Sequence, residues 1–294
     1  MRRTLILPFL FLALSTNAQR TIPVSKPVSA ASPASVAMSP ERLARIDAAA
    51  DQWVRDGYTN GCVALILRDG KIVYHKAFGY NDADKKQPLK ADDIFRIASQ
   101  SKAITSVAAM MLYEEGKFQL DDPISKYIPE FKGNGVTLRH MLTHTSGMGE
   151  ATPAELASAK TLAEMVPIYA KKPSGFAPGS QWRYCQSGIN MLGRVVEVVS
   201  KMPLDQFFAK RLFKPLGMKD TAFGVSADRL GRLAAMYGHP DLMDANLTLL
   251  QIFSPPHLGT NERRDVSDTY PTDRPDTFQR GGVGLFYHGR AGDA

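Results

Sequence analysis

The order in which two hydrophobic patterns follow one another constrains the fold of this chain more than any other feature. An apolar run from Cys62 to Leu67, an Asp-Gly pair at 69–70 and a second run over 71–80 predict a β-hairpin, because Asp-Gly readily adopts the positive φ angles of a tight turn. The apolar residues that follow recur mainly at helical spacing. A hairpin followed by helices predicts an α+β protein. Because two strands alone are marginally stable, further strands are expected downstream.

Helices are predicted wherever apolar side chains repeat every three or four residues. The first begins at Pro40, with Ser39 as its N-cap and an apolar stripe that includes Leu43, Ile46 and Trp53. The other predicted helices run over 101–115, over 137–144, over 188–200 and from 203 onward.

The N-terminus has the layout of a secretory leader. Arg2 and Arg3 precede an apolar run over residues 5–14, and small residues suited to cleavage end at Ala18. The alternative, a buried N-terminal helix, does not account for the paired arginines. Residues 1–18 are therefore predicted to be a signal peptide, and 19–40, rich in Ser, Pro and Ala, a flexible linker. The mature chain is expected to be periplasmic or secreted.

Composition and charge exclude several classes of protein. With 44% hydrophobic and 22% charged residues, the chain is neither disordered nor a multi-span membrane protein. Its net charge of +7 is scattered without long basic runs, which argues against nucleic-acid binding. Cys62 and Cys185 cannot form a disulfide framework and are predicted to be free thiols. His140 and His144 lack the His-Glu pair of zinc proteases, so both are predicted to be structural.

A Ser-x-x-Lys sequence at Ser99 and Lys102 is the first candidate for catalysis. It opens the predicted 101–115 helix, which places the two side chains within reach of each other. The positive end of a helix stabilises a developing oxyanion, and a lysine in a dry cleft can lose its proton and serve as a base for the serine. Such a motif is expected about once by chance in a chain of this composition. The alternative is therefore a serine near a helix cap beside a solvated lysine.

Four segments in a fixed order carry a resemblance to a known family. They are FRIASQSKAIT at 95–105, LDDPISKYIP at 120–129, TLRHMLTHTSGM at 137–148 and PLGMKDT at 215–221. Together they resemble the serine β-lactamase and penicillin-binding protein superfamily, and most closely its class C β-lactamases and the related carboxylesterases and D-Ala-D-Ala peptidases. The resemblance runs from about Ser39 to Phe286. It implies, for residues 41–294, a β-lactamase/transpeptidase-like hydrolase domain with an antiparallel sheet flanked by helices and a mostly helical subdomain.

The resemblance also implies a tyrosine and an amide at the site. The family's Tyr-x-Asn element corresponds here to Tyr184-Cys185-Gln186. Tyr184 is then expected to face Ser99 and Lys102, acting as general base and later as general acid. Gln186 replaces the asparagine of the family and is one methylene longer, and its amide is expected to contact the substrate carbonyl and Lys102. Cys185 is expected to be a small packing residue.

The family's third element, Lys-Thr-Gly or His-x-Gly, has no counterpart in this sequence. Residues 281–286 resemble the glycine-rich segment that precedes it, and His288-Gly289 does not fit the motif. The chain is therefore expected to be truncated or frameshifted at its C-terminus, with an incomplete sheet and 287–294 as an unrelated tail. The amide of Ser99 is expected to supply one oxyanion contact, and the second donor to lie outside the chain. Loss of one such donor costs on the order of 10²–10³ in rate.

These features together predict an exported serine hydrolase that cleaves an ester or an amide through an acyl-enzyme on Ser99. Lys102 and Tyr184 are expected to move protons, and Gln186 to bind substrate. No metal or organic cofactor is implied, and the expected partner is a small-molecule or peptidyl acyl substrate rather than nucleic acid or a membrane. Three interpretations stay open: a promiscuous esterase or β-lactamase, a D-Ala-D-Ala peptidase, and a catalytically incomplete binding or sensor relative.

Overall fold

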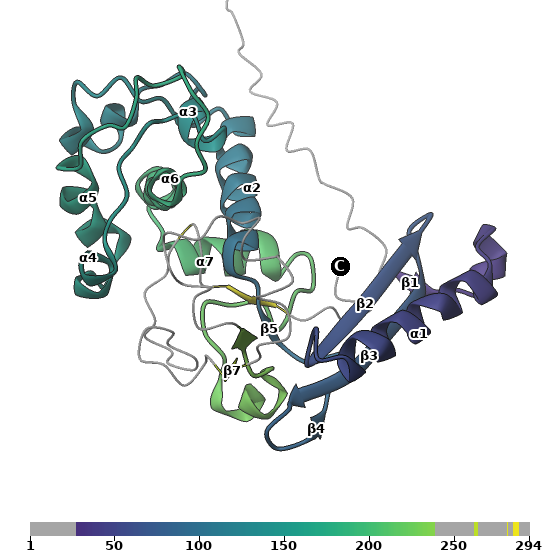
Figure 1. Cartoon of the computed structure of the whole chain (residues 1–294). Helices are drawn as coiled ribbons and strands as arrows, with labels where there is room; N and C mark the ends of the chain where they lie inside the picture. Colours follow the sequence, from purple (N-terminus) through teal and green to yellow (C-terminus); the bar gives the residue numbers. More distant parts are fainter. Residues whose placement is uncertain (1–27, 239–261, 264–280, 282–284, 288–294) are drawn as a thin grey trace, which may run out of the picture.

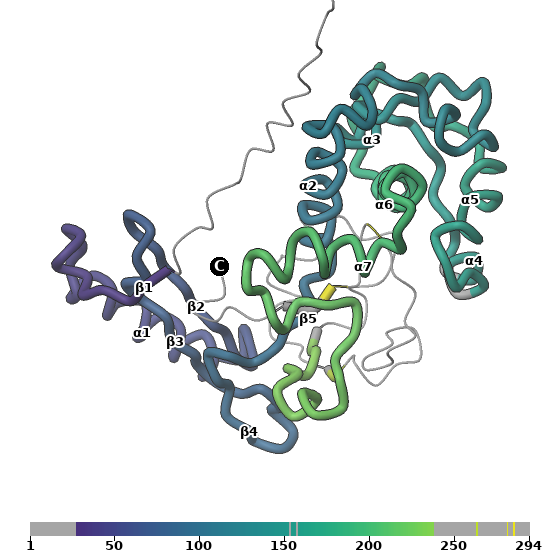
Figure 2. Tube along the Cα trace, turned by 180° about the vertical axis from the view of Figure 1, so that it is seen from behind, coloured from purple at the N-terminus to yellow at the C-terminus, as the bar shows by residue number. Residues whose placement is uncertain are grey.

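The computed structural model describes residues 28–238, 262–263, 281 and 285–287. The predicted signal peptide, the first part of the predicted linker and the His288-Gly289 pair lie outside these residues. The division into signal peptide, linker and 41–294 domain stays a prediction. A hairpin region packed against one helix lies beside a larger helical region, as the views from the front and from behind show (Figure 1, Figure 2). The α+β class predicted from the sequence is confirmed.

The hairpin region is a small mixed sheet covered by a helix. The predicted hairpin is formed by β2 (Gly61–Arg68) and β3 (Lys71–Asp82), and α1 (Pro40–Arg55) packs against β3. Ser39 caps α1 as predicted, because its side chain accepts a hydrogen bond from the Arg42 amide at 3.1 Å.

Two short strands extend this sheet beyond the hairpin. β1 (Ser29–Ala30) runs parallel to β3, and β4 (Gln87–Pro88) runs antiparallel to it. The sheet is therefore mixed, rather than purely antiparallel as expected. Residues of the predicted linker thus form regular structure, namely β1 and a 3-10 turn at Pro33–Val36 whose last side chain is buried.

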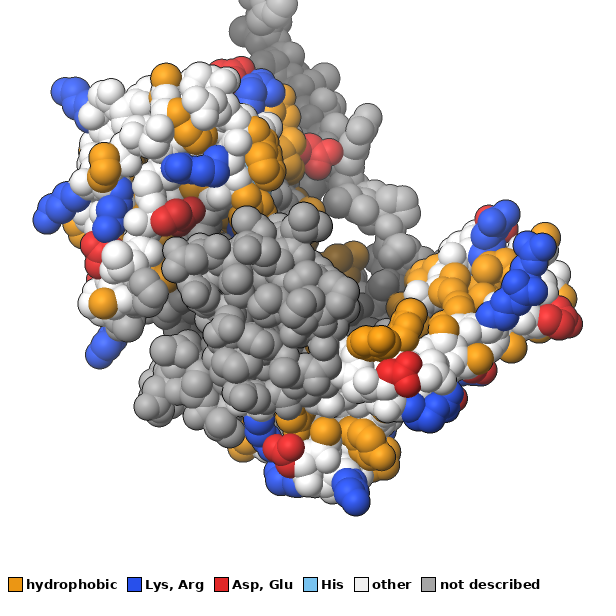
Figure 3. All heavy atoms as spheres, viewed as in Figure 1, with side chains coloured by type: hydrophobic (Ala, Val, Ile, Leu, Met, Phe, Trp, Pro, Cys, Tyr) orange, Lys and Arg blue, Asp and Glu red, His pale blue; other side chains and the backbone are white. Residues whose placement is uncertain are grey.

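The hairpin region exposes apolar side chains. Within the described residues β2 has a strand on one side only, and Leu65 and Leu67 on it are exposed. Hydrophobic side chains gather on the surface of this region (Figure 3). Trp53, at one end of the predicted apolar stripe of α1, is 51% exposed, whereas Leu43 on the same stripe is buried.

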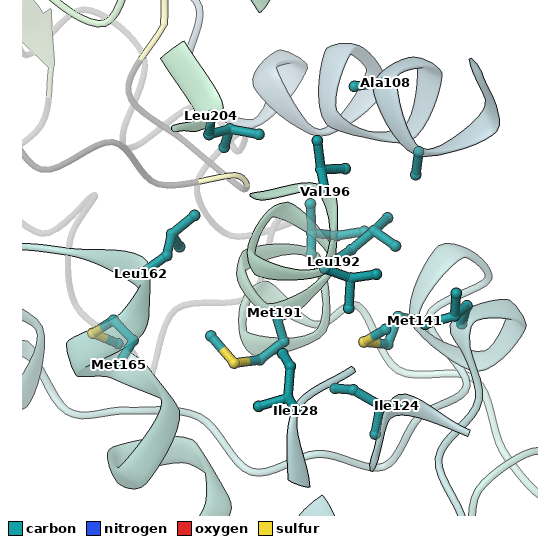
Figure 4. Packing of buried hydrophobic residues seen from close by; sticks show 14 of the residues in the cluster. Ala108, Ile124, Ile128, Met141, Leu162, Met165, Met191, Leu192, Val196 and Leu204 are labelled. Carbon is teal, nitrogen blue, oxygen red and sulfur yellow. The ribbon is translucent and has the colours of Figure 1, made fainter. Parts of the chain in front are cut away.

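The helical region is built around one central helix, α6 (Gln186–Ser200), which contacts four other helices. Its middle is fully buried, with Met191, Leu192 and Val195 inaccessible to solvent (Figure 4). The helices around it are α2 (Ser101–Glu114), α3 (Leu138–Leu142), α5 (Leu162–Ala170) and α7 (Leu204–Phe208). Two further elements are α4 (Pro153–Ser158) and a π-helical turn at Ala209–Phe213. The predicted helices are thus confirmed, with ends shifted by a few residues.

Two short strand pairs join segments that lie far apart in the sequence. β5 (Phe95–Arg96) pairs antiparallel with β8 (Phe286–Tyr287), and β6 (Tyr237–Gly238) pairs with β7 (Glu262–Arg263). Gly281 passes between α2 and α6, where Thr105 donates a hydrogen bond to its carbonyl. A Cβ at Gly281 would lie 2.7 Å from the carbonyl oxygen of Ile189, so only glycine fits there without a shift of backbone.

Candidate active site

Ser99 lies in a tight turn immediately before α2 rather than in the helix itself. The 3-10 turn η2 covers Ala98–Gln100, and α2 begins at Ser101. Ala98 has a left-handed φ of 42°, a conformation that costs a residue with a Cβ about 1–2 kcal/mol. The turn leaves the side chain of Ser99 exposed, three residues before Lys102.

Ile97 and Ser101, on either side of the turn, both form hydrogen bonds with Leu285. Ser101, which is fully buried, donates to the Ala98 carbonyl at 2.7 Å and accepts from the Leu285 amide at 3.2 Å. The amide of Ile97 donates to the Leu285 carbonyl at 3.1 Å. Sequence reasoning missed this role of Ser101, which was only a middle position of the Ser-x-x-Lys motif. These bonds offset the strain at Ala98.

Lys102 joins the two helices that carry the predicted site. Its side chain is buried, and its Nζ donates to the Ser99 Oγ at 3.0 Å and to the Gln186 Oε1 at 2.6 Å. Gln186 is the first residue of α6, so these two bonds connect the start of α2 to the start of α6. The alternative of a solvated lysine is therefore excluded for this structure.

Tyr184 lies at the same place but presents its ring to the lysine. The Nζ of Lys102 is 4.8 Å from the centroid of the Tyr184 ring, within cation–π distance. The Tyr184 side chain is 51% exposed, so one part of it faces solvent beside Ser99. The structure thus brings together all four predicted site residues, Ser99, Lys102, Tyr184 and Gln186, while their chemical roles stay predictions.

The ring of His144 packs against the ring of Tyr184, a contact that sequence reasoning missed. The two rings lie 4.7 Å apart with an angle of 35° between their planes, and Trp182 meets His144 edge-on at 6.2 Å. The His144 Nδ1 accepts a hydrogen bond from the Cys185 amide at 3.1 Å, so the proton of the neutral ring is on Nε2. The ring of His140 accepts a hydrogen bond from the Thr137 amide in a capping box at the start of α3.

Acidification is expected to destabilise the protein through His144. Burial, and then the positive charge of Lys102, hold the pKa of His144 below its usual value of 6.5. Below pH 6.5 the unfolded chain therefore takes up a proton here before the native state does, and the free energy of unfolding falls as the pH decreases. His144→Asn keeps an acceptor and tolerates the residue's φ of 58°. Urea unfolding between pH 7.5 and 5.5 should show a smaller loss in this variant; an equal loss in both proteins would contradict the assignment.

Glu150 holds the first turn of α6 and was also missed. Its two carboxylate oxygens accept from the amides of Gln186 at 2.6 Å and Ser187 at 3.0 Å. A carboxylate at this position pairs with the orphan N–H groups and the positive end of the helix. No local sequence pattern could have identified it, because its partners are more than thirty positions away in the chain.

Cys185 fills the remaining space beneath the site. Its buried sulfur lies 3.0 Å from the Ser187 Oγ and accepts from the Gly188 amide at the N-cap of α6. Burial raises the pKa of this thiol, which favours its neutral form. The prediction that Cys62 and Cys185 are free thiols is confirmed.

The described residues show the features of neither a metal site nor a membrane-spanning helix. No group of three or more His, Cys, Asp or Glu side chains in these ranges is arranged to hold a metal ion. Within the same residues, no helix combines the length and the hydropathy that a membrane span requires.

Comparison with known proteins gives a consistent result. A family model described as Beta-lactamase matches residues 46–256. Esterase EstB of Burkholderia gladioli is 35% identical over 206 residues, which are 63% of this chain and 52% of that protein. Penicillin-binding protein 4* of Bacillus subtilis (strain 168) is 33% identical over 171 residues, which are 55% of this chain and 37% of that protein. The chain thus spans about half the length of esterase EstB and less than half the length of penicillin-binding protein 4*.

A solved structure matches more of the chain. It is that of EstCE1, described as a hydrolase with promiscuous acyltransferase activity. The two structures superpose with a TM-score of 0.67 at 29% sequence identity, covering 84% of this chain and 69% of that one. The likeness therefore extends over most of the chain.

Proposed function

The chain belongs to the beta-lactamase family, and we propose that it is a serine hydrolase that cleaves an ester or amide bond through a covalent acyl-enzyme on Ser99. Its fold is the β-lactamase/transpeptidase-like fold, with a mixed sheet that is not closed in the part of the chain that the structure describes. The likeness to an esterase and to a hydrolase with acyltransferase activity supports the reaction class. The observation that carries the proposal is the pair of hydrogen bonds from Lys102 to Ser99 and Gln186.

The first chemical step follows from these contacts. With Lys102 neutral, the Ser99 Oγ attacks the substrate carbonyl carbon while its proton passes to the Lys102 Nζ, 3.0 Å away. The backbone amide of Ser99, in the turn before α2, donates one hydrogen bond to the oxyanion. The bond to the leaving alcohol or amine then breaks, and the leaving group takes the proton. We assign the relay of this proton to the hydroxyl of Tyr184, a residue whose ring lies next to Lys102, with 4.8 Å between the Nζ and the ring centroid.

The second half of the reaction releases the product. A water molecule attacks the ester carbon of the acyl-enzyme and gives up a proton to the same base, and the bond to the Ser99 Oγ breaks. The Ser99 oxygen recovers its proton, and the acid product leaves. The Gln186 Oε1 accepts from Lys102 at 2.6 Å, so an N–H of its Nε2 is the donor that we assign to a substrate carbonyl.

The proposal is tested by trapping the acyl-enzyme. The full chain is incubated with p-nitrophenyl butyrate, with a chromogenic cephalosporin and with a fluorescent penicillin, and adducts are mapped by peptide mass spectrometry. We expect turnover of the butyrate ester and an adduct on Ser99 that is absent in Ser99→Ala. Ser158→Ala, which removes an exposed hydroxyl from α4, should label normally.

The other interpretations correspond to distinct outcomes of this experiment. Labelling by penicillin without release of product would favour a penicillin-binding relative, an interpretation that the similarity to penicillin-binding protein 4* supports. Turnover of the cephalosporin as well as the ester would add a β-lactamase activity. Well-folded protein that neither hydrolyses a substrate nor carries a label would refute the hydrolase proposal.

Export is part of the proposal. The paired arginines and the apolar run of residues 1–18 support a leader that is removed, with the mature protein in the periplasm or secreted. Fractionation of a Gram-negative host that expresses the full chain, with N-terminal sequencing of the product, would place the protein and the cleavage site.

A further inference from the structure

The hydrogen bonds that begin at Lys102 continue into the buried interior between α6 and α5. The Nε2 of Gln186 donates to the Asn190 Oδ1 at 3.4 Å, one helical turn along α6. The Nδ2 of Asn190 in turn donates to the hydroxyl oxygen of Tyr169 on α5 at 2.8 Å. Asn190 is fully buried and Tyr169 is 3% exposed. We call this chain of hydrogen bonds, from the Gln186 amide through the Asn190 amide to the Tyr169 hydroxyl, the amide series.

We propose that Asn190 is a positioning residue, which fixes the rotation of the Gln186 amide so that its carbonyl oxygen faces Lys102. An ammonium group has donors only, so an amide can face it only with its oxygen. This choice turns the Nε2 of Gln186 toward Asn190, which must then offer Oδ1. A flipped Gln186 amide would place NH₂ against the ammonium and oxygen against oxygen, and both hydrogen bonds would be lost.

The consequence for catalysis rests on the proposed function of Lys102 as the base. A neutral amine has one lone pair. Because Gln186 keeps its oxygen toward Lys102, one N–H of that amine stays directed at Gln186 when Lys102 has lost its proton. The lone pair is then available on the side of the Ser99 hydroxyl, 3.0 Å away. Asn190 therefore acts on the nucleophile through two intermediate side chains, without contact to the substrate.

A double-mutant cycle tests this coupling. In Asn190→Leu the Gln186 amide is free to turn its NH₂ toward the neutral amine. We expect kcat for p-nitrophenyl butyrate to fall about tenfold, the value of one hydrogen bond, with a smaller change in KM. The acid limb of the pH–rate profile should move to lower pH. In Gln186→Leu the amide is gone, so adding Asn190→Leu should cost no further activity.

Controls separate positioning from support of the fold. Asn81→Leu removes another buried asparagine, in the hairpin region, and should lower the Tm without moving the pH–rate profile. Tyr169→Phe, a milder change, should show the same lack of additivity with Gln186→Leu if Asn190→Leu does not fold. Effects that multiply in the double variant, or an unmoved pH–rate profile in the single one, would overturn the proposal.

A readout without catalysis distinguishes failure of this inference from failure of the proposed function. The side-chain amide protons of Gln186, assigned by their absence in Gln186→Leu, are followed by NMR hydrogen exchange. We expect Asn190→Leu to speed their exchange at least about tenfold. Unchanged exchange would refute the positioning role of Asn190 even in an active enzyme. Faster exchange in a chain that hydrolyses nothing would uphold it and refute the hydrolase proposal alone.

Discussion

Replacing Lys102 by arginine is expected to lower kcat/KM for p-nitrophenyl butyrate by about 10³, nearly as much as Ser99→Ala. Arginine keeps the positive charge and the donors that face Ser99 and Gln186, but its guanidinium does not give up a proton. A positioned general base contributes about 10²–10⁴ in rate, which arginine cannot supply. Because serine and base act as a unit, the Ser99→Ala and Lys102→Arg double variant should be no slower than either single variant.

Two controls test whether the lower activity of Lys102→Arg reflects the loss of a general base. Lys76→Arg changes an exposed lysine that pairs with Asp47, far from the site along the chain, and should leave kcat/KM within twofold, as is usual for surface substitutions. Thermal unfolding should show that the Lys102→Arg protein is folded. If this variant retained more than about a tenth of the activity, the role of Lys102 would be electrostatic, and the proton would have to pass to another group.

Local patterns predicted those parts of the fold that depend on neighbouring residues. Ser39 and Pro40 define the start of α1 through capping chemistry, and the Asp-Gly pair at 69–70 defines the hairpin turn. The exposure of Trp53 could not be predicted in the same way. Apolar spacing shows which face of a helix is suited to burial, whereas the elements that cover that face come from elsewhere in the chain.

The contacts of the candidate site also fall into those that sequence spacing predicts and those that depend on the folded structure. Ser99 and Lys102 are three positions apart, a spacing that predicted their side chains within reach of each other, although Ser99 lies in the turn before α2. The resemblance to a family supplied Tyr184 and Gln186, which reach Lys102 only because α6 packs on α2. Glu150 contacts its partners across more than thirty residues and belongs to no motif, so only the folded structure could reveal it.

The strained conformation of Ala98 is held in place by hydrogen bonds that its neighbours form with Leu285. A left-handed residue before the nucleophile needs surrounding bonds that fix its conformation, and Ser101 and Ile97 provide them from the segment at Leu285. The geometry of Ser99 therefore depends on a segment almost two hundred residues away. The Ser-x-x-Lys motif carries no information about this segment, so the geometry of Ser99 could not be predicted from the motif.

Leu192→Ala is expected to lower the free energy of unfolding by about 3 kcal/mol, because removing a fully buried leucine side chain leaves a cavity that the packed helices fill only in part. Most domains have only about 5–15 kcal/mol of stability, so the loss is large. Leu216→Ala makes the same change at a side chain that is 44% exposed and should cost about 0.5 kcal/mol or less. Urea unfolding of the two variants measures the difference. A cost below about 1 kcal/mol for Leu192→Ala would mean that α6 does not form the centre of the core, and that the contact between Lys102 and Gln186 depends on other packing.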